Sequence, residues 1–458
     1  MNDLTATAIP ELIKEKDASR LLAVLSTLSC FEIAEMIVNK VKDDQLFVFN
    51  VLPPQLAANI FDYLPPAKQL QILKELPTLQ IANILLAMNP DDRTAFLEDL
   101  PKQAVAEYIK LLPNGERALA VKLLGYPEDT VGRLMTTDYL TVKMDWTCEQ
   151  ALDHIRAYGH DSETISMIYV VNDENLLLDD IKIREFLFAP KSNKVSQLAD
   201  KKFVALSDFD SDETGIAVFK MHSLNALPVI NDAGILLGIV TIDDILRLAG
   251  EKNTENFQKV GGTEALDEPY MDISFFALMK KRVRWLILLF LGEMFTATAM
   301  GFFEVEIAKA VVLALFLPLI ISSGGNAGSQ SSTLIIRAMA LGEVKLKDGW
   351  KVLRREIFSG IFLGSVLGCI GFARITLWSS VSDIYGAHSI LLAITVACAL
   401  LGVVLWGTLS GAMLPLLLRR LGADPAVSSA PLVATLVDVT GIIIYFIIAM
   451  SILKGTLL

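Results

Sequence analysis

Acidic side chains stand inside long apolar stretches of the 458-residue chain at two places, Glu293 and Asp438. Asp438 is flanked by residues 425–437 and 439–453, neither of which contains a charged residue. A carboxylate at the centre of a bilayer costs roughly 2.5–3.5 kcal/mol even on insertion scales, so such a residue is expected to be functional. We interpret Asp438 as an ion site, with a protonated aspartate that caps a neighbouring helix as the alternative. For Glu293, contact with a partner helix and contact with an ion stay equally open.

A polar stretch, ISSGGNAGSQSST at residues 321–333, lies inside a second apolar run, just after Pro318. Asn326 and Gln330 are four residues apart, so their amides lie on one helical face and can offer carbonyl oxygens. We expect Pro318 and the paired glycines to break the helix, and broken backbone at membrane depth is tolerated where it is buried or lines water. The stretch is predicted to line a pore with Asp438 and Thr435. Close helix packing through small residues is the alternative.

Soft metal ligands are sparse, because the four cysteines and four histidines are far apart and match no zinc or disulfide spacing. A bound metal would therefore take oxygen ligands, which favours a hard cation. In a symmetric dimer two copies of Asp438 would meet on the axis, and their repulsion would require a cation between them. The chain has no GxxxxGK phosphate-binding loop and no nucleophile–base set, so we expect passive ion movement and no enzyme activity.

Five segments are apolar and long enough to span a bilayer as helices. They are residues 285–303, 308–336, 358–378, 390–418 and 431–453. Basic residues gather before the first segment and after the second and fourth, whereas the alternate loops are poor in them. The positive-inside rule then places the soluble part in the cytosol and the C-terminus outside. The N-terminus lacks an apolar signal segment, so no cleaved signal peptide is expected. The predicted location is the inner (plasma) membrane.

The acidic charge lies entirely in the soluble part of the chain. Of the 52 acidic and 40 basic residues, 9 acids and 11 bases fall in residues 285–458, which leaves 43 acids and 29 bases in residues 1–284. Such a surface repels nucleic acid and attracts cations, so nucleic acid is excluded as a partner. Ordinary solubility is the alternative reading of this charge.

The soluble part contains two regions with different sequence patterns. Leu-Pro pairs recur about every 12 residues from Leu52 to Pro113, with helical apolar spacing between them, which predicts a small α-solenoid. From Val131 strand-like and helical runs alternate in a duplicated α/β unit. The predicted domains are therefore a helical repeat at 1–128, an α/β pair at 129–250, a connecting helix at 251–283 and an all-α five-helix membrane domain at 284–458.

The chain resembles the MgtE family of magnesium channels over nearly its full length. The motifs that carry the resemblance are PLIISSGGNAGSQSSTLIIRAMALGE at 318–343, SSAPLVATLVDVTG at 428–441, LMTTDYLTVKMDWTCEQALDHIR at 134–156, GGTEALDEPYMD at 261–272 and the paired CBS pattern. The resemblance implies a homodimer in which spans two and five of both subunits line the pore, with Asp438 holding hydrated Mg²⁺. It also implies tandem CBS domains followed by a plug helix.

The resemblance further implies regulation, in which cytosolic Mg²⁺ binds acidic groups of the soluble part and closes the pore. The candidate regulatory ligands are Asp91, Asp244, Glu255 and Asp424. Gly238, Thr241 and Asp244 are similar to the nucleotide-ribose motif of CBS domains, which implies ATP as a further ligand. Arg247 and Asn256 stand where acids are common in the family, and the first CBS unit lacks the usual glycine-containing return strand, so weaker gating by Mg²⁺ is expected.

The expected function is Mg²⁺ influx down its electrochemical gradient. A negative-inside potential of 100 mV drives a divalent ion inward with about 4.6 kcal/mol. The alternatives are a related Co²⁺ or Mn²⁺ transporter, a membrane-tethered CBS sensor that transports nothing, and a CBS-regulated transporter of another substrate such as an anion. The intramembrane Asp438 and the polar stretch argue against a mere anchor, and the missing intramembrane basic site argues against an anion.

Overall fold

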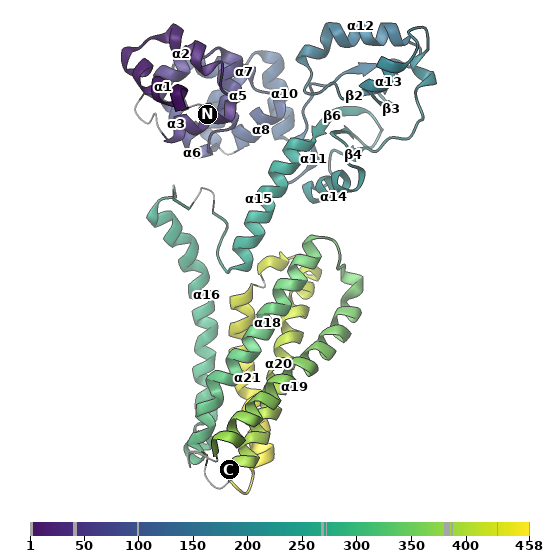
Figure 1. Cartoon of the computed structure of the whole chain (residues 1–458). Coiled ribbons are helices and arrows are strands. Elements are labelled where there is room, and N and C mark those ends of the chain that lie inside the picture. The colour runs from purple at the N-terminus through teal and green to yellow at the C-terminus, as the bar shows by residue number, and fades with distance from the viewer. Residues whose placement is uncertain are drawn as a thin grey trace. The chain divides into compact units, whose positions relative to one another are not determined.

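The structure, a computed structural model, describes residues 3–39, 44–98, 100–266, 270–271, 273–379, 385, 388–427 and 429–457. The chain forms two compact units, Met1–Glu251 and Lys252–Leu458 (Figure 1). Each unit is considered by itself below.

The first unit begins with a succession of short helices. These are α1 (Asp3–Glu15), α2 (Ala18–Leu25), α3 (Cys30–Asn39), α4 (Gln45–Val51), α5 (Pro54–Asp62), α6 (Pro66–Glu75), α7 (Thr78–Ala87), α8 (Pro90–Glu98), α9 (Lys102–Ile109) and α10 (Asn114–Leu124). Prolines stand at the first turn or N-cap of α5 to α10, where a missing N–H costs no helical hydrogen bond. The predicted helical repeat is thus confirmed.

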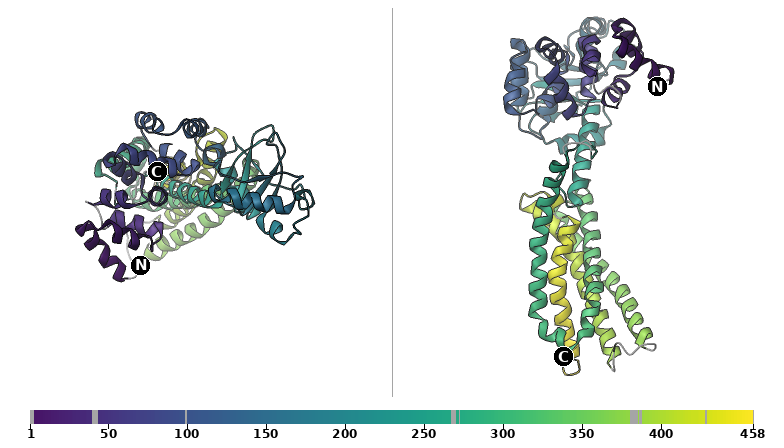
Figure 2. Two further views of the ribbon diagram at one scale, coloured as in Figure 1. Left: turned by 90° about the horizontal axis from the view of Figure 1, so that it is seen from above. Right: turned by 90° about the vertical axis from the view of Figure 1, so that its left-hand side faces the viewer.

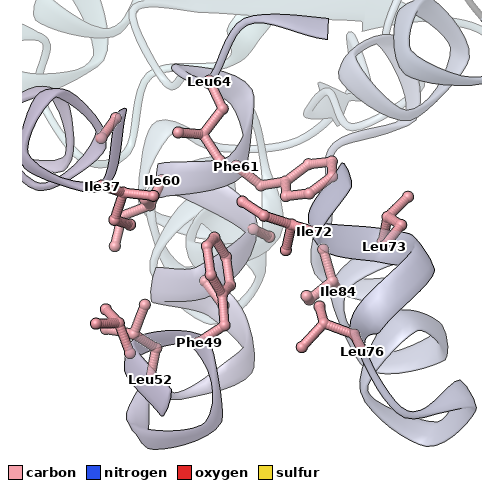
Figure 3. Packing of buried hydrophobic residues seen from close by; sticks show 14 of the residues in the cluster. Ile37, Phe49, Leu52, Ile60, Phe61, Leu64, Ile72, Leu73, Leu76 and Ile84 are labelled. Atoms are coloured by element: carbon pink, nitrogen blue, oxygen red, sulfur yellow. The ribbon is translucent and has the colours of Figure 1, made fainter. Parts of the chain in front are cut away.

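The apolar residues of these helices form one core (Figure 3). Phe61 is completely buried and contacts the rings of Phe49 and Phe96 edge-to-face, with centroids 6.3 and 5.4 Å apart. The leucines before the prolines, such as Leu64 and Leu76, point into the same core. Each Leu-Pro pair therefore buries a side chain and starts the next helix, which explains the recurrence of the pair.

Two small mixed sheets follow, each with its own helices. The elements are α11 (Val131–Leu134), β1 (Thr141–Val142), α12 (Cys148–Tyr158), η1 (Gly159–Asp161), β2 (Met167–Val171), β3 (Leu177–Lys182), α13 (Ile183–Phe188), η2 (Val195–Gln197), β4 (Leu206–Ser207), α14 (Asp212–His222), β5 (Ala226–Ile230) and β6 (Leu236–Thr241). In each sheet the first strand is parallel to the second, and the second forms an antiparallel hairpin with the third. This repetition confirms the duplicated α/β unit, and the first copy keeps its return strand, β3, without a glycine.

The second unit contains the long apolar helices. They are α16 (Phe275–Phe302), α17 (Glu304–Lys309), η3 (Val311–Phe316), α18 (Leu317–Ala340), η4 (Leu346–Asp348), α19 (Gly349–Ser379), α20 (Ser389–Arg420), η6 (Pro425–Val427) and α21 (Ala430–Leu453). In the described part of the chain, five helical segments are long and apolar enough to cross a membrane, as predicted. The helices α18 to α21 pack on one another and α16 packs on α21 (Figure 2).

Helix boundaries differ from the predicted ones in three places. The connecting helix predicted at residues 251–283 is not one helix, because α15 ends at Val260 and α16 already begins at Phe275. The helix α15 (Ile242–Val260) runs through residue 250 without interruption, so the α/β pair and the connecting helix share one element. The expected break within residues 321–333 is wrong, because α18 is continuous from Leu317 to Ala340. Pro318 stands in the first turn of α18, where it is compatible with a helix, and the glycines serve helix packing instead.

Glycines allow the backbones of the membrane helices to touch. A Cβ on Gly324 would lie 2.5 Å from a methyl group of Val403, and one on Gly328 would lie 2.9 Å from the carbonyl oxygen of Gly407, both on α20. In α19, Gly364 would meet the backbone of α20 in the same way. Such close approach is how helices associate in lipid, where no hydrophobic effect drives them together.

Candidate functional site

A polar cavity of about 370 Å³ lies between α18 and α21. It is lined by Pro318, Ile321, Ser322, Gly325, Asn326, Ser329, Ala434 and Asp438. Its polar groups are one carboxyl, one side-chain amide and two hydroxyls, all with oxygen atoms that suit a hard cation. The structure thus brings together the two strongest sequence candidates, Asp438 and Asn326.

Helical periodicity explains how this cavity forms. On α18 the residues Ser322, Asn326 and Ser329 follow one another at spacings of four and three, so they share a face. The opposite face carries Gly324 and Gly328, which pack against α20. The two alternatives for this stretch, cavity lining and close packing, are therefore both realised, on different faces of one helix.

The position of α21 is fixed by its own apolar residues and by one hydrogen bond to α18. Val433 and Val437 are completely buried in the core of the second unit, which turns Ala434 and Asp438 toward the cavity. The Ser329 hydroxyl donates to the carbonyl oxygen of Ala430 at 3.1 Å. Asp438 is therefore presented by a helix that is packed into the core and hydrogen-bonded to α18, as a preorganised site requires.

Two other pore candidates lie elsewhere. The Thr435 hydroxyl donates to the carbonyl oxygen of Pro431 at 3.0 Å, and its methyl group lies 3.0 Å from the position of a Cβ on Gly292 in α16. Gln330 is exposed on α18 and is not among the lining residues, and Glu293 is exposed on α16. The serines Ser322 and Ser329 were missed from the sequence, although their spacing around Asn326 was the available signal.

A second group of acids lies in the first unit. Asp91 and Asp92 stand in the first turn of α8, and Asp244 stands in the first turn of α15. Each can offer one carboxylate oxygen, and these oxygens all lie within 4.8 Å of one another. Asp91 and Asp244 are buried, so the three side chains form a compact oxygen-rich group, which we call the acidic cluster.

The acidic cluster is only partly neutralised by its neighbours. The Arg247 guanidinium donates to Asp244 Oδ1 at 2.9 Å, and the Thr241 hydroxyl donates to Asp244 Oδ2 at 2.8 Å. Burial and the nearby Asp244 charge raise the pKa of Asp91 well above its usual range. Burial, then the charges of Asp62 and Asp244, raise the pKa of Asp92 to about 7. Near neutral pH the cluster therefore favours a bound proton or a bound cation.

The raised pKa of Asp92 predicts that the stability of the folded chain depends on pH. Because the pKa of Asp92 is higher in the folded state than in the unfolded chain, the folded state binds the proton more tightly, and stability falls as pH rises from about 4 to about 7. Asp92→Asn should therefore raise the free energy of unfolding by about 1–2 kcal/mol at pH 8 without Mg²⁺ and have little effect at about pH 4.

Thermal unfolding of the full chain at the two pH values, with a chelator, measures this effect. Glu75→Gln is the matched control, because Glu75 is exposed at the end of α6. Equal stabilisation by Asp92→Asn at both pH values would contradict the assignment. Added Mg²⁺ should reduce the difference between the variant and the wild type, since the cation supplies the missing charge.

The other two regulatory candidates form a separate group in the second unit. The Lys259 ammonium lies 2.7 Å from Glu255 Oε1 and 2.7 Å from Asp424 Oδ2. Burial alone would lower the pKa of Lys259, but its hydrogen bonds to the two carboxylates more than offset this and raise it. The structure thus brings Glu255 and Asp424 together around a resident cation. Lys259 was missed from the sequence, although its spacing of four from Glu255 was visible.

The three nucleotide candidates have structural contacts of their own. A Cβ on Gly238 would lie 2.6 Å from the carbonyl oxygen of Thr136, so the glycine permits β6 to pair with Thr136. Thr241 is buried and holds Asp244 at the start of α15. These contacts account for a glycine, a threonine and an aspartate at the three positions without a bound nucleotide. The three residues lie near one another, on β6 and at the start of α15.

Comparison with known proteins agrees with this architecture. The family model MgtE, described as a divalent cation transporter, matches residues 317–448, the MgtE intracellular N domain matches 28–129, and the CBS domain matches 131–190 and 195–251. A magnesium transporter MgtE of Thermus thermophilus is 35% identical over 459 residues, which cover 99% of this chain and 100% of that protein. One of Bacillus subtilis is 29% identical over 71% of this chain and 70% of its own length.

Two solved structures resemble the soluble part. The cytosolic domain of the Mg²⁺ channel MgtE in complex with ATP is 28% identical, with a TM-score of 0.51, and the match covers 53% of this chain and 99% of that one. The soluble part of a magnesium transporter is 24% identical, with a TM-score of 0.53, and the match covers 55% of this chain and 98% of that one.

Proposed function

Since this chain belongs to the MgtE family of magnesium transporters, we propose that it is a channel that conducts Mg²⁺ inward past the polar cavity of α18 and α21. The observation that carries the proposal is the presence of Asp438 and Asn326 in one cavity. Mg²⁺ dehydrates reluctantly and keeps several of its waters. A carboxylate with an amide and two hydroxyls can hold such a hydrated ion through its water shell.

The polar cavity is open along one side of the chain, and Asn326 is exposed there. A homodimer would close this side with a second copy and place two Asp438 carboxylates about one divalent ion, which balances their charge. Basic residues on alternate loops support an orientation with the soluble part in the cytosol and the C-terminus outside the plasma membrane. A negative-inside potential then drives influx without ATP hydrolysis.

Ion flux into liposomes that contain the purified chain tests this proposal. A negative-inside potassium diffusion potential should drive Mg²⁺ entry, read with an enclosed Mg²⁺-sensitive dye, and the rate should rise with the imposed potential. Parallel measurements with Co²⁺ and Mn²⁺ determine the selectivity. Entry no faster than in protein-free liposomes, from protein that remains monodisperse, would reject the channel.

Gating by cytosolic Mg²⁺ is the second part of the proposal. The acidic cluster is short of positive charge, because among the described residues Arg247 forms an ion pair with Asp244 but with neither Asp91 nor Asp92. A bound divalent ion would relieve the repulsion that raises the pKa values there. We propose that this binding, and binding at Glu255 and Asp424, stabilises the non-conducting state.

Lys259 makes the second site testable, because its ammonium stands between Glu255 and Asp424 where a metal would compete with it. Lys259→Met should lower the Mg²⁺ concentration that gives half-maximal protection of α15 from protease by about tenfold, roughly 1.4 kcal/mol. The control is Lys280→Met, since Lys280 is exposed on α16. An unchanged midpoint in Lys259→Met would mean that Glu255 and Asp424 bind no regulatory Mg²⁺.

We also propose that the α/β pair binds ATP near Gly238, Thr241 and Asp244. The support is the ATP complex of the 28% identical cytosolic domain and the nearness of these residues to one another. Calorimetric titration of ATP into the chain should show binding that Thr241→Val weakens, and unchanged binding would move the nucleotide elsewhere.

A further inference from the structure

A second, larger cavity lies in the membrane unit, away from the polar one. It has a volume of about 610 Å³, within the range of roughly 300–1,000 Å³ that is usual for ligand cavities. Its walls come from α20, from η4, from Gly349 at the start of α19 and from Leu436 of α21, and they include Trp406, Met413 and Leu417. None of the lining residues of the polar cavity takes part. We call this the apolar cavity.

The charges at the apolar cavity are of one sign. Lys347 and Arg420 are its charged lining residues, and no acid is among the described residues that line it. Both side chains are exposed, and neither forms an ion pair with an acid in the described part of the chain. The nearest acid in sequence, Asp348, accepts hydrogen bonds from Lys351 at 3.1 Å and from the backbone of Lys345, and it attracts Lys347 only over a longer distance.

The two basic residues of the apolar cavity stand at the ends of membrane-spanning segments, where lipid headgroups are expected. Arg420 ends α20 and Lys347 lies in η4, just before α19, so both belong to the basic ends of the spans. Trp350, in the first turn of α19, is 75% exposed, as expected of a tryptophan at the membrane–water interface. The exposed side chains of Leu417 on α20 and Leu436 on α21 continue the apolar wall of the cavity.

We infer that the apolar cavity binds an anionic phospholipid, with the phosphate between Lys347 and Arg420 and an acyl chain against Trp406, Met413 and Leu417. Basic pockets between membrane helices are sites for anionic headgroups. The charge favours this occupant over a second copy of the chain, because an apolar helix face would leave both cations buried and unpaired. A zwitterionic lipid would bring its own ammonium group to two cations, so it should bind more weakly.

Fluorescence of Trp406 provides a direct test on the full chain. Phosphatidylglycerol with brominated acyl chains, titrated into the chain in neutral detergent, should quench a component of the emission that Trp406→Phe removes. Brominated phosphatidylcholine should quench this component much less. Inorganic phosphate at equal concentration should neither quench it nor compete, which distinguishes a lipid site from a free-anion site.

Charge variants complete the test. Lys347→Gln and Arg420→Gln should each weaken phosphatidylglycerol binding about fivefold, which at 1.4 kcal/mol per tenfold is about 1 kcal/mol. Lys345→Gln is the matched control, because Lys345 is exposed in the same loop but does not line the cavity. Ser410→Trp would fill the cavity and should abolish the Trp406-dependent quenching, with unfolding temperature as the check on folding.

Three results would overturn the inference. Equal quenching by both brominated lipids would show that charge plays no part. Unchanged affinity in Lys347→Gln and Arg420→Gln would remove the phosphate site. Dissociation of an oligomer by Ser410→Trp, with no quenching in the wild type, would show that another copy of the chain covers the cavity. Each readout is binding or assembly, so it is independent of whether the chain conducts Mg²⁺.

Discussion

Asp438→Asn is expected to lower potential-driven Mg²⁺ entry into liposomes by at least about 100-fold while the protein stays folded. The substitution keeps the shape of the side chain and removes its charge. At an effective dielectric constant of about 20, two unit charges 4 Å apart interact with about 4 kcal/mol, so loss of one carboxylate beside a divalent ion should cost roughly 3 kcal/mol or more. At 1.4 kcal/mol per tenfold this corresponds to the stated loss.

The controls separate the site from a general effect of acidic charge. Glu304→Gln, on the exposed helix α17, should conduct as the wild type does. Asn326→Ala should have a smaller effect than Asp438→Asn, about tenfold, because it removes a neutral ligand from the same cavity. If Asp438→Asn conducted Mg²⁺ as fast as the wild type, the ion path could not depend on the polar cavity, even for a member of this family.

The sequence was sufficient for the residues whose signal is local. Asp438 stands out because an acid is costly among apolar neighbours, and Asn326 because its face of α18 is polar. The length of the apolar segments likewise predicted the five apolar helices. Helical spacing between recurring Leu-Pro pairs predicted the proline-started helices of the first unit. In these cases the residue type and its neighbours in sequence are enough for the prediction, and the partner helix need not be known.

Contacts between residues that are far apart in the sequence could not be predicted from local patterns. Thr435 stands three residues before Asp438, a spacing that usually places two residues near one another on a helix. Its methyl group nevertheless packs toward Gly292 on α16, and its hydroxyl donates to the carbonyl oxygen of Pro431. Lys259 meets Asp424, which lies 165 residues away, and the acidic cluster joins α8 to α15. Such contacts depend on tertiary packing, which the spacing within one segment does not specify.

The glycines of α18 illustrate why local rules failed there. Gly324 and Gly325 lower helix propensity, which favoured a break, but the helix continues because Gly324 allows close contact with α20. The packing energy outweighs a propensity cost of about 1 kcal/mol per glycine. The contact between α18 and α20 therefore holds the cavity-lining face of α18 in place, and it should be sensitive to any added atom.

Gly411→Ala is expected to destabilise the membrane unit by about 3 kcal/mol or more, because its Cβ would overlap the backbone carbonyl of Gly328. The neighbouring atoms belong to the backbone of another helix, so no side-chain rotation can relieve the overlap. Gly407→Ala should act likewise, since its Cβ would overlap the carbonyl of Gly324. Thermal unfolding in detergent, followed by size-exclusion chromatography, measures the loss.

Gly301→Ala is the matched control, because Gly301 lies in the membrane helix α16 with nothing within 4 Å of its Cβ position. This variant should unfold at the wild-type temperature or slightly above it, since alanine favours a helix. Equal behaviour of Gly411→Ala and Gly301→Ala would show that α18 and α20 do not touch through their backbones. In that case α18 could not hold Asn326 opposite Asp438 by this contact, and the polar cavity would need another support.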